Sequence, residues 1–243
     1  HPATYQGVRK GYEDYFENQI LRFISKPIIN YLRIWDKIAS QRPDIIIAIS
    51  KEVQKRIKKY YDRDSEIIYP PLSLATSDWQ LATSKNAKKD KKLIANQLVA
   101  SSYFLIVSRL VPYKKIDLAV KVFNKLNLPL KIVGKGSEER KLKAMANENI
   151  EFLGHLTDEE LVKYYKECRA LIFPGKEDFG LTILEAQSFG KSIIAFRGGG
   201  AQESVIEGKT GVFFDQQTQK SLEDVLHKFM RKKFDPKDCI IQA

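Results

Sequence analysis

Two glutamates separated by a glycine-containing turn form the stretch of this chain best suited to chemistry. Glu177 follows an apolar run typical of a strand, and Glu185 lies eight positions later, in a predicted helix that begins at Phe179, Gly180 and Leu181. The first N–H groups of a helix lack internal partners and carry the positive end of its dipole, so they can hold a phosphate. Carboxylates nearby would accept hydrogen bonds from hydroxyls. The pattern predicts a nucleotide-sugar site, although an isolated pair of glutamates is more often simply solvated.

Two cations follow another apolar run, at 103–108. Arg109 and Lys114 stand five positions apart after the end of that run. Arginine offers a planar fork of donors and lysine a compact point charge, and together they suit a pyrophosphate. Because the chain contains 41 lysines and arginines, two ordinary surface cations are the alternative interpretation.

Glycine turns end three further apolar runs. Gly134, Gly136 and Gly154 follow two of them, and the triple glycine 198–200 follows the third. The turn at Gly134 lacks the third glycine of the dinucleotide fingerprint, and no acidic residue ends the next strand as a ribose ligand for NAD would. The triple glycine either allows unusual backbone angles near a ligand or another domain, or forms a flexible loop.

In this order and spacing the motifs resemble the retaining glycosyltransferases of family 4, which have the GT-B fold and include bacterial mannosyltransferases. The resemblance runs from about Asp44 to Phe234. It implies that Arg109 and Lys114 stabilise a leaving diphosphate and that Glu177 contacts the donor sugar, so these three are the catalytic candidates. It also implies that Glu185 contacts the ribose. Further substrate contacts are implied for Asp178, Phe179, Gly180, Leu181, Gly134, Gly136 and Gly154.

The reaction implied by the resemblance moves a hexose from a nucleoside-diphosphate sugar, such as GDP-mannose or a UDP-hexose, to a hydroxyl of a saccharide or lipid-linked acceptor. No cofactor or metal is expected, because the cations replace a metal, and no side chain needs to act as a nucleophile. The implied setting is the synthesis of bacterial cell-surface polysaccharide or glycolipid.

Two alternatives stay open. One is a GT-B sugar-nucleotide epimerase or phosphorylase, and the other is a non-enzymatic basic binder of nucleotides or nucleic acid. Aromatic and basic residues are not interleaved on one sheet face, as binders of single strands require. No zinc-finger or helix-turn-helix pattern is present. Nucleic acid is therefore not an expected partner.

Apolar runs alternate with helical segments throughout the second half of the chain. Such alternation predicts an α/β protein of GT-B type, with a Rossmann-like doubly wound parallel sheet that binds ligands at the carboxyl ends of its strands. Thr157 and Glu160 form a capping box that begins one helix. The strands are expected at 103–108, 130–133, 150–153, 170–173, 192–196 and 211–214. The predicted parts are the end of an acceptor domain at 1–72, a linker at 73–102, a donor domain at 103–231 and the start of a crossover segment at 232–243.

The first 72 residues predict the end of a second Rossmann-like domain. The run 44–50 predicts a strand buried on both faces. In the helix expected at 51–61, Val53 and Ile57 should point inward, while the lysines form either a solvated face or a contact with anionic lipid. One buried face of an earlier helix is expected from Ile28, Tyr31, Leu32, Trp35 and Ile38.

The net charge of +11 favours polyanionic partners, namely anionic lipid surfaces, phosphorylated ligands or nucleic acid. Cys168 and Cys239 are far apart, which indicates neither a disulfide framework nor a zinc site. Together with the absence of any apolar run near the roughly 20 residues of a membrane span, this favours the cytoplasm, with peripheral binding at the inner membrane face as an option. The DxD pattern at 62–64 is interpreted as a turn rather than a metal site, and His155 as a surface residue.

The first residue, His1, is not a methionine, and no signal segment follows it. This favours an internal fragment of a longer protein. The segment that begins at His1 either matches a cleft histidine of the family or is a disordered end.

Overall fold

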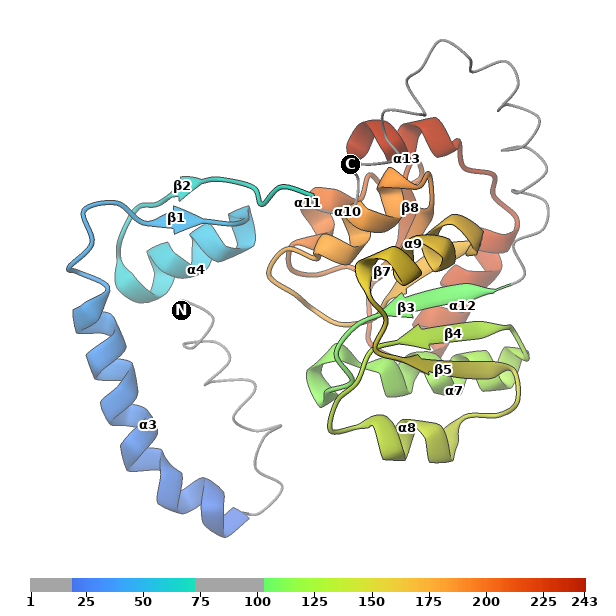
Figure 1. Ribbon diagram of the computed structural model, residues 1–243. Helices are drawn as coiled ribbons and strands as arrows, with labels where there is room; N and C mark the ends of the chain where they lie inside the picture. Colours follow the sequence, from blue (N-terminus) through green and yellow to red (C-terminus); the bar gives the residue numbers. More distant parts are fainter. Residues whose placement is uncertain (1–18, 73–102) are drawn as a thin grey trace. The chain divides into compact units, whose positions relative to one another are not determined.

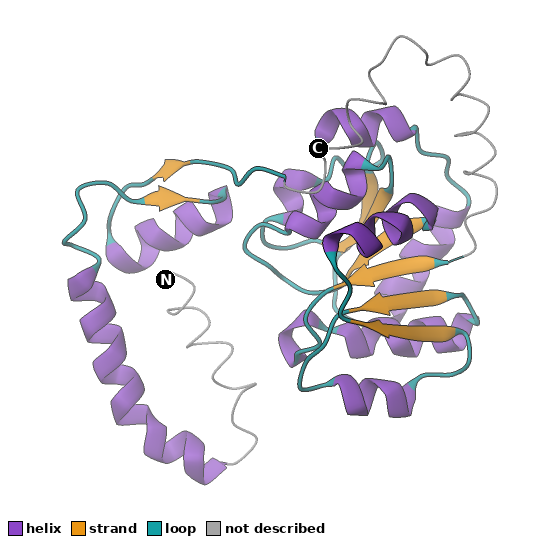
Figure 2. Ribbon diagram, in the orientation of Figure 1, coloured by secondary structure: helices purple, strands orange, loops and turns teal. Residues whose placement is uncertain are grey.

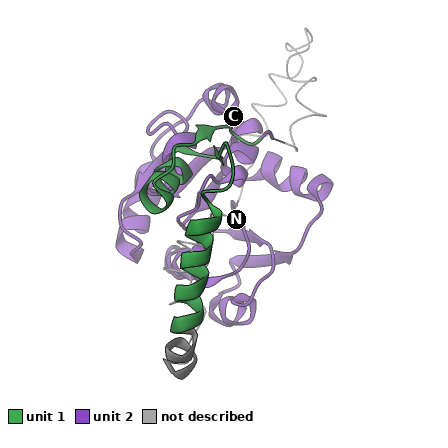
Figure 3. Ribbon diagram, turned by 90° about the vertical axis from the view of Figure 1, so that its left-hand side faces the viewer, with its two compact units in different colours: residues 1–70 green, residues 71–243 purple. Residues whose placement is uncertain are grey.

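The computed structural model describes residues 19–72 and 103–243, except for the side chains of residues 19–25. The chain divides into two compact units, residues 1–70 and 71–243 (Figure 3). The predicted linker 73–102 and the candidate His1 lie outside the described residues. Within the described ranges, none of the helices has both the length and the apolar character that a bilayer crossing requires.

Six parallel strands form the centre of the unit 71–243 (Figures 1 and 2). Their order across the sheet is β5-β4-β3-β6-β7-β8. The chain therefore starts in the middle, winds to one edge, returns to the middle and winds to the other edge. The predicted strands and the Rossmann-like doubly wound sheet are confirmed. The strands are β3 (Phe104–Val107), β4 (Leu130–Val133), β5 (Ile150–Gly154), β6 (Ala170–Phe173), β7 (Ser192–Phe196) and β8 (Gly211–Phe214).

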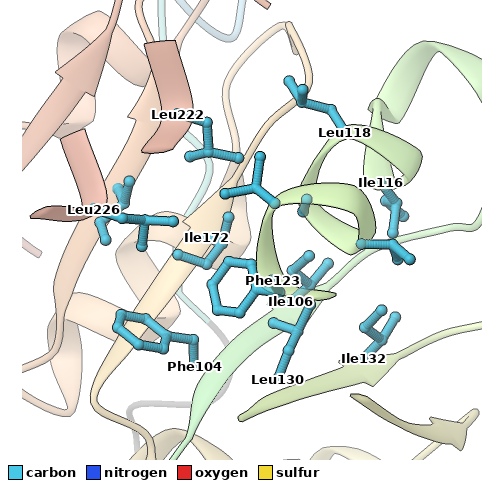
Figure 4. Close-up of a cluster of buried hydrophobic side chains, with 14 of the residues drawn as sticks. Phe104, Ile106, Ile116, Leu118, Phe123, Leu130, Ile132, Ile172, Leu222 and Leu226 are labelled. Carbon is cyan, nitrogen blue, oxygen red and sulfur yellow. The ribbon is translucent and has the colours of Figure 1, made fainter. Parts of the chain in front are cut away.

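Helices α7, α8 and α12 cover one face of this sheet. Successive strand residues point to opposite faces, and Phe104 and Ile106 of β3 point to this one, where they meet Phe123 and Leu226 in the larger core (Figure 4). The rings of Phe104 and Phe123 pack edge to face with their centroids 5.3 Å apart. The three helices are α7 (Ile116–Leu126), α8 (Glu139–Met145) and α12 (Gln219–Met230).

The opposite face carries a second core. Leu105 of β3 and Leu171 of β6 pack there with Tyr165 and Ile183. The last helix of the chain packs against α10 in the same unit. The helices on this side are α9 (Asp158–Glu167), α10 (Leu181–Ser188) and the short α11 (Ala201–Ser204), and the last helix is α13 (Pro236–Gln242).

The capping box predicted for α9 is confirmed. The Thr157 hydroxyl accepts a hydrogen bond from the Glu160 backbone N–H at 3.3 Å. The Glu160 carboxylate accepts one from the Thr157 N–H at 2.8 Å. These bonds lower the pKa of Glu160. They fix the start of the helix that carries Tyr165.

Within its described residues, the unit 1–70 contains two helices and two short parallel strands: α3 (Gln19–Ala39), β1 (Ile47–Ala48), α4 (Lys51–Tyr61) and β2 (Glu66–Ile67). α4 begins at Ser50, whose hydroxyl accepts from the Val53 N–H at 3.1 Å, and it ends at Asp62, which has a left-handed backbone. Val53 and Ile57 are buried as predicted.

Two predictions for this unit are wrong. The apolar face of α3 is exposed, with Trp35 54% and Tyr31 68% accessible. The run 44–50 is not buried on both faces either, because Ala48 is buried while its neighbour Ile47 is 54% exposed. β1 pairs with β2, and α4 packs on one side of it. Apolar periodicity fixes which side chains share a face, but it does not supply the element that covers them.

Candidate active site

The two motifs that motivated a ligand site follow the two central strands. The chain leaves β3 toward α7 on one face of the sheet and leaves β6 toward α10 on the other. At such a topological switch point the loops diverge and open a crevice beyond the carboxyl ends of the strands, where ligands of doubly wound sheets bind. Arg109 and Lys114 follow β3, and Glu177 follows β6. The strand order thus brings both predicted motifs to one place.

Lys114 and Glu177 form an ion pair at this switch point, between Nζ and Oε1. Lys114 ends the 3-10 helix η2 (Pro112–Lys114) and is only 8% exposed. Its ammonium also lies 5.3 Å from the centroid of the Tyr113 ring. Because one partner is almost fully buried, removing either would leave a charge poorly compensated.

The loop after β6 is fixed by close backbone contacts on two sides. A Cβ atom at Gly175 would lie 2.9 Å from the Cα of Lys114, so glycine is needed where this loop crosses η2. On the other side, Gln217 donates from Nε2 to the Pro174 carbonyl at 2.9 Å. These contacts position the backbone that leads to Glu177. No motif in the sequence marked Gly175 or Gln217.

The triple glycine packs directly on the Glu177 loop. Gly199 pairs with Glu177 in a parallel bridge, and the Gly200 N–H donates to the Glu177 carbonyl at 2.9 Å. A Cβ at Gly199 would lie 2.0 Å from that carbonyl oxygen, and one at Gly200 would lie 2.4 Å from the Cα of Phe179. Gly199 has a φ of 66°, so the expected unusual angle is confirmed. The flexible-loop alternative is wrong, because all three glycines are buried.

Arg109 is exposed at the same strand end. Its Nη2 donates to the Tyr113 hydroxyl at 2.9 Å, which links it to η2. The predicted cation pair therefore consists of one buried lysine and one exposed arginine on neighbouring backbone. Both follow β3, and the point charge of a lysine beside the planar fork of an arginine suits a ligand that carries several phosphate oxygens.

Helix α10 begins at a glycine with a left-handed backbone. Gly180 occupies the N-cap position with φ 89° and ψ 61°, and as a glycine it has no side chain with which to cap the first turn. Phe179 is buried and Leu181 is exposed, while Asp178 is half-buried. The Phe179 side chain therefore anchors the turn in the core. Its neighbours place the first backbone N–H groups of α10 at the carboxyl edge of β6, where a phosphate could bind them.

Glu185 lies in the second turn of α10 and points toward α9. Its Oε2 accepts a hydrogen bond from the hydroxyl of Tyr165 at 2.7 Å. Burial raises the pKa of Glu185, the Tyr165 bond opposes that rise, and the neighbouring Asp158 adds to it. The contact of Tyr165 with Glu185 was not predicted from the sequence. Its spacing from Leu161 marks a buried helix face, but nothing in the sequence indicates its partner.

The predicted glycine turns of β4 and β5 serve the turn that carries Arg109. A Cβ at Gly134 would lie 1.9 Å from the Ser108 carbonyl oxygen, and one at Gly136 would lie 2.2 Å from that of Leu110. The Gly134 N–H donates to the Gly154 carbonyl at 2.6 Å. Gly134 and Gly154 both have positive φ. The three glycines thus let neighbouring turns stack closely at the carboxyl edge of the sheet.

The two remaining candidates have simpler explanations. His155 is exposed, as predicted. Asp62 and Asp64 both lie near Lys58, at 3.5 and 3.3 Å. Asp62 ends α4 with a left-handed backbone, and the pair lies in the connection between α4 and β2, where the sequence placed it. Across residues 19–72 and 103–243, no three His, Cys, Asp or Glu side chains are grouped closely enough to hold a metal ion.

The parallel sheet and the charged loops at its switch point define an α/β protein of GT-B type. Residues 88–243 match the family model described as glycosyl transferases group 1, and the chain belongs to this family. It is 24% identical over 197 residues to the uncharacterized glycosyltransferase MJ1178 of Methanocaldococcus jannaschii, covering 79% of this chain and 51% of that protein. With the O-antigen chain mannosyltransferase C of Escherichia coli it shares 27% identity over 174 residues, which cover 68% and 43% of the two chains.

The fold matches solved structures of the same type. One is the Anabaena protein HepE in complex with UDP and glucose, with a TM-score of 0.67 and 20% identity over 87% of this chain and 59% of that one. Another is sucrose-phosphate synthase from Thermosynechococcus elongatus, with a TM-score of 0.66 and 21% identity over 86% and 54%. The chain spans about half the length of the curated relatives it matches.

Proposed function

We propose that this chain supplies the donor site of a retaining glycosyltransferase of family 4, which moves a hexose from a nucleoside-diphosphate sugar to an acceptor hydroxyl. The observation that carries the proposal is the Lys114–Glu177 ion pair at the switch point. It joins a phosphate-binding cation to a carboxylate able to hold sugar hydroxyls, in the crevice where doubly wound sheets bind ligands. The donor is GDP-mannose or a UDP-hexose, and the acceptor is a saccharide or a lipid-linked sugar.

Charge on the leaving diphosphate is stabilised by groups that are already in place. The Lys114 ammonium has three N–H donors, so its pairing with Glu177 leaves others for phosphate oxygens. Arg109, exposed at the same strand end, adds a planar fork. We expect the backbone N–H groups at the start of α10, which follows the same strand as Glu177, to bind phosphate oxygens as well. Donors fixed before the reaction favour the transition state, because they need little rearrangement as charge develops.

The sugar and the ribose are held by the two carboxylates. Glu177 orients sugar hydroxyls through the oxygen that Lys114 does not occupy, and Glu185 accepts from ribose hydroxyls. The acceptor oxygen attacks the anomeric carbon on the face from which the diphosphate leaves. The new carbon–oxygen bond forms as the bond to phosphate breaks, and the acceptor proton passes to the leaving phosphate. No side-chain nucleophile takes part, and the two cations act in place of a metal ion.

Isothermal calorimetry of this chain with UDP, GDP and ADP, each in the presence of EDTA, tests the donor site. We expect one nucleotide to bind with a micromolar dissociation constant, which would identify the donor base and show that binding needs no divalent metal. If one nucleotide binds only when Mg²⁺ or Mn²⁺ replaces EDTA, the two cations do not substitute for a metal. If none binds under either condition, the donor-site proposal is wrong.

We propose that the protein acts at the cytoplasmic face of the inner membrane, in cell-surface polysaccharide or glycolipid synthesis. Lys51, Lys55 and Lys59 are exposed on α4, and a basic helix surface attracts anionic headgroups by about 1 kcal/mol per lysine. The similarity to an O-antigen chain mannosyltransferase supports the proposed role in cell-surface polysaccharide synthesis. Replacing all three lysines by Gln should abolish sedimentation with phosphatidylglycerol vesicles, whereas replacing Lys141, Lys143 and Lys220 of the other unit should not. Equal sedimentation of both triple variants would contradict this assignment.

A further inference from the structure

We propose that Tyr165 is a positioning residue of the nucleotide site, whose hydroxyl holds the Glu185 carboxylate in the orientation that ribose hydroxyls require. The inference rests on the proposed function, because it takes Glu185 to be the ribose contact. It adds to that function a residue on a different helix, which is itself buried away from any ligand.

Core packing fixes the Tyr165 hydroxyl in place. Tyr165 has no exposed surface and belongs to the core on the α9–α10 face of the sheet. Its ring stacks on that of Phe189, with centroids 5.8 Å apart and the planes 13° apart. A ring enclosed in this way keeps one orientation. The hydroxyl therefore reaches Glu185 Oε2 from a fixed point, at 2.7 Å.

Glu185 retains unused hydrogen-bonding capacity after this contact. An ionised carboxylate has two oxygens with about four acceptor sites. Among the residues that the structure describes, Tyr165 donates the hydrogen bond that this side chain accepts. Buried polar groups are normally satisfied by partners. A half-buried carboxylate with one donor is therefore suited to a ligand that brings hydroxyls of its own, because those hydroxyls offset its desolvation.

The surroundings of Glu185 make the Tyr165 contact the one that favours the ionised carboxylate. Among the residues that the structure describes, the titratable groups that influence its pKa are Tyr165 and Asp158, both on α9. Burial and Asp158 raise the pKa of Glu185, and the bond from Tyr165 lowers it. Burial also raises the pKa of Tyr165 well above its ordinary value, so its hydroxyl remains a donor. Removing that hydroxyl should therefore make Glu185 easier to protonate.

Tyr165→Phe is the test variant, because it removes one hydroxyl and keeps the ring. Tyr103→Phe is a matched control: Tyr103 is buried in the same core, and its hydroxyl donates to the Tyr164 carbonyl at 3.3 Å rather than to Glu185. The first measurement needs no ligand. Carboxyl-detected NMR titration should show a higher pKa of Glu185 in Tyr165→Phe and an unchanged one in Tyr103→Phe. An unchanged pKa in both variants would overturn the inference.

The second measurement uses the nucleoside diphosphate that binds the unaltered chain and its 2′-deoxy analogue. Loss of one hydrogen bond to a charged group should weaken binding of the ribonucleotide to Tyr165→Phe by roughly tenfold, with a smaller change for the deoxy analogue. The acid limb of binding should also shift to higher pH. Tyr103→Phe should show neither change. If Tyr165→Phe lost the same affinity for both nucleotides at every pH, Tyr165 would contribute only to packing and the positioning role would be wrong.

The two proposals fail in different ways. If the unaltered chain binds no nucleoside diphosphate, the proposed function is wrong, and the NMR titration still decides whether Tyr165 controls Glu185. If the unaltered chain binds and Glu185→Gln weakens binding while Tyr165→Phe does not, the donor site stands and the positioning role is wrong.

Discussion

Glu177 and Glu185 belong to one short motif, yet the protein holds them in different ways. Glu177 lies on a loop, and its carboxylate faces the buried ammonium of Lys114. Glu185 lies on a helix and faces the neutral hydroxyl of Tyr165, with a second acid, Asp158, nearby. One carboxylate is compensated by a full positive charge and the other by a single hydrogen bond. The same substitution at the two positions should therefore have opposite effects on stability.

The largest effect is expected from breaking the ion pair. Lys114→Met leaves Glu177 without its cation, and Glu177→Gln leaves a nearly buried ammonium unpaired. Each change should lower the free energy of unfolding by about 3 kcal/mol, and Lys114→Met should also weaken nucleotide binding at least roughly tenfold, as expected when one charge of a buried pair is removed. Chemical denaturation and calorimetry measure the two quantities.

The double variant Lys114→Met/Glu177→Gln separates stability from binding. It contains no unpaired charge, so its stability should recover relative to the sum of the single changes, while its nucleotide affinity should stay low. Lys121→Met is the control, because Lys121 pairs with Asp117 at the surface, at 3.2 Å. An exposed pair of this kind contributes less than about 1 kcal/mol. A cost for Lys114→Met no greater than that of Lys121→Met would contradict the buried pair.

A smaller effect is expected from disturbing the backbone that carries Glu177. Gly199→Ala would place a Cβ 2.0 Å from the Glu177 carbonyl oxygen, at a φ of 66°. We expect a loss of about 2 kcal/mol in unfolding free energy from the left-handed backbone and the contact together, with weaker nucleotide binding. Thermal unfolding and calorimetry check the two outcomes.

Gly208→Ala separates those two causes. Gly208 has a φ of 77°, but the nearest atom to its Cβ would be the Nζ of Lys232 at 3.0 Å, the free end of a flexible side chain. It should cost about 1 kcal/mol for the backbone angle alone and leave binding unchanged. If both variants weakened nucleotide binding equally, the contact between the triple glycine and the Glu177 loop would not matter for the site.

Most of the fold of the unit 71–243 can be predicted from local sequence. Strands such as β6 and β7 are apolar runs bounded by polar residues, and apolar alternation with helices specifies a parallel sheet. The box at Thr157 and Glu160 is equally local. The pairing of residues far apart in the sequence cannot be predicted in this local way. That Lys114 meets Glu177 depends on β3 and β6 being neighbours at the centre of the sheet, which no single segment encodes.

The roles of individual glycines and the burial of the first helix also depend on context. The triple glycine was expected to adopt unusual backbone angles near a ligand or another domain, or to form a flexible loop, but its packing on the Glu177 backbone could not be predicted. Trp35 has the spacing of a buried face and is exposed. Likewise, Tyr165 could be recognised as a core residue from its helical period, but not as a partner of Glu185. A periodic pattern identifies a side, and tertiary structure decides what lies against it.

The smallest and most discriminating effect is expected from Glu185→Gln. Because burial raises the pKa of Glu185 in the folded protein, the folded state binds this proton more tightly than the unfolded state does. The stability that the group contributes is therefore fully present below its ordinary pKa and is lost as pH rises through the raised value. Near pH 7 the buried, ionised carboxylate therefore lowers the stability of the folded state, and glutamine removes this cost. The glutamine carbonyl still accepts a hydrogen bond from Tyr165.

Glu185→Gln should consequently melt slightly above the unaltered protein at pH 7, and the difference should close as pH falls toward the ordinary carboxyl range. Its nucleotide affinity should nevertheless fall, because a neutral amide is a weaker acceptor for ribose hydroxyls than a carboxylate. Thermal melts over a pH series, with calorimetry at pH 7, test both signs. Glu177→Gln provides the contrast, since it should be less stable at the same pH. If both glutamine variants shifted in the same direction, the two carboxylates would not be held by the different interactions described above.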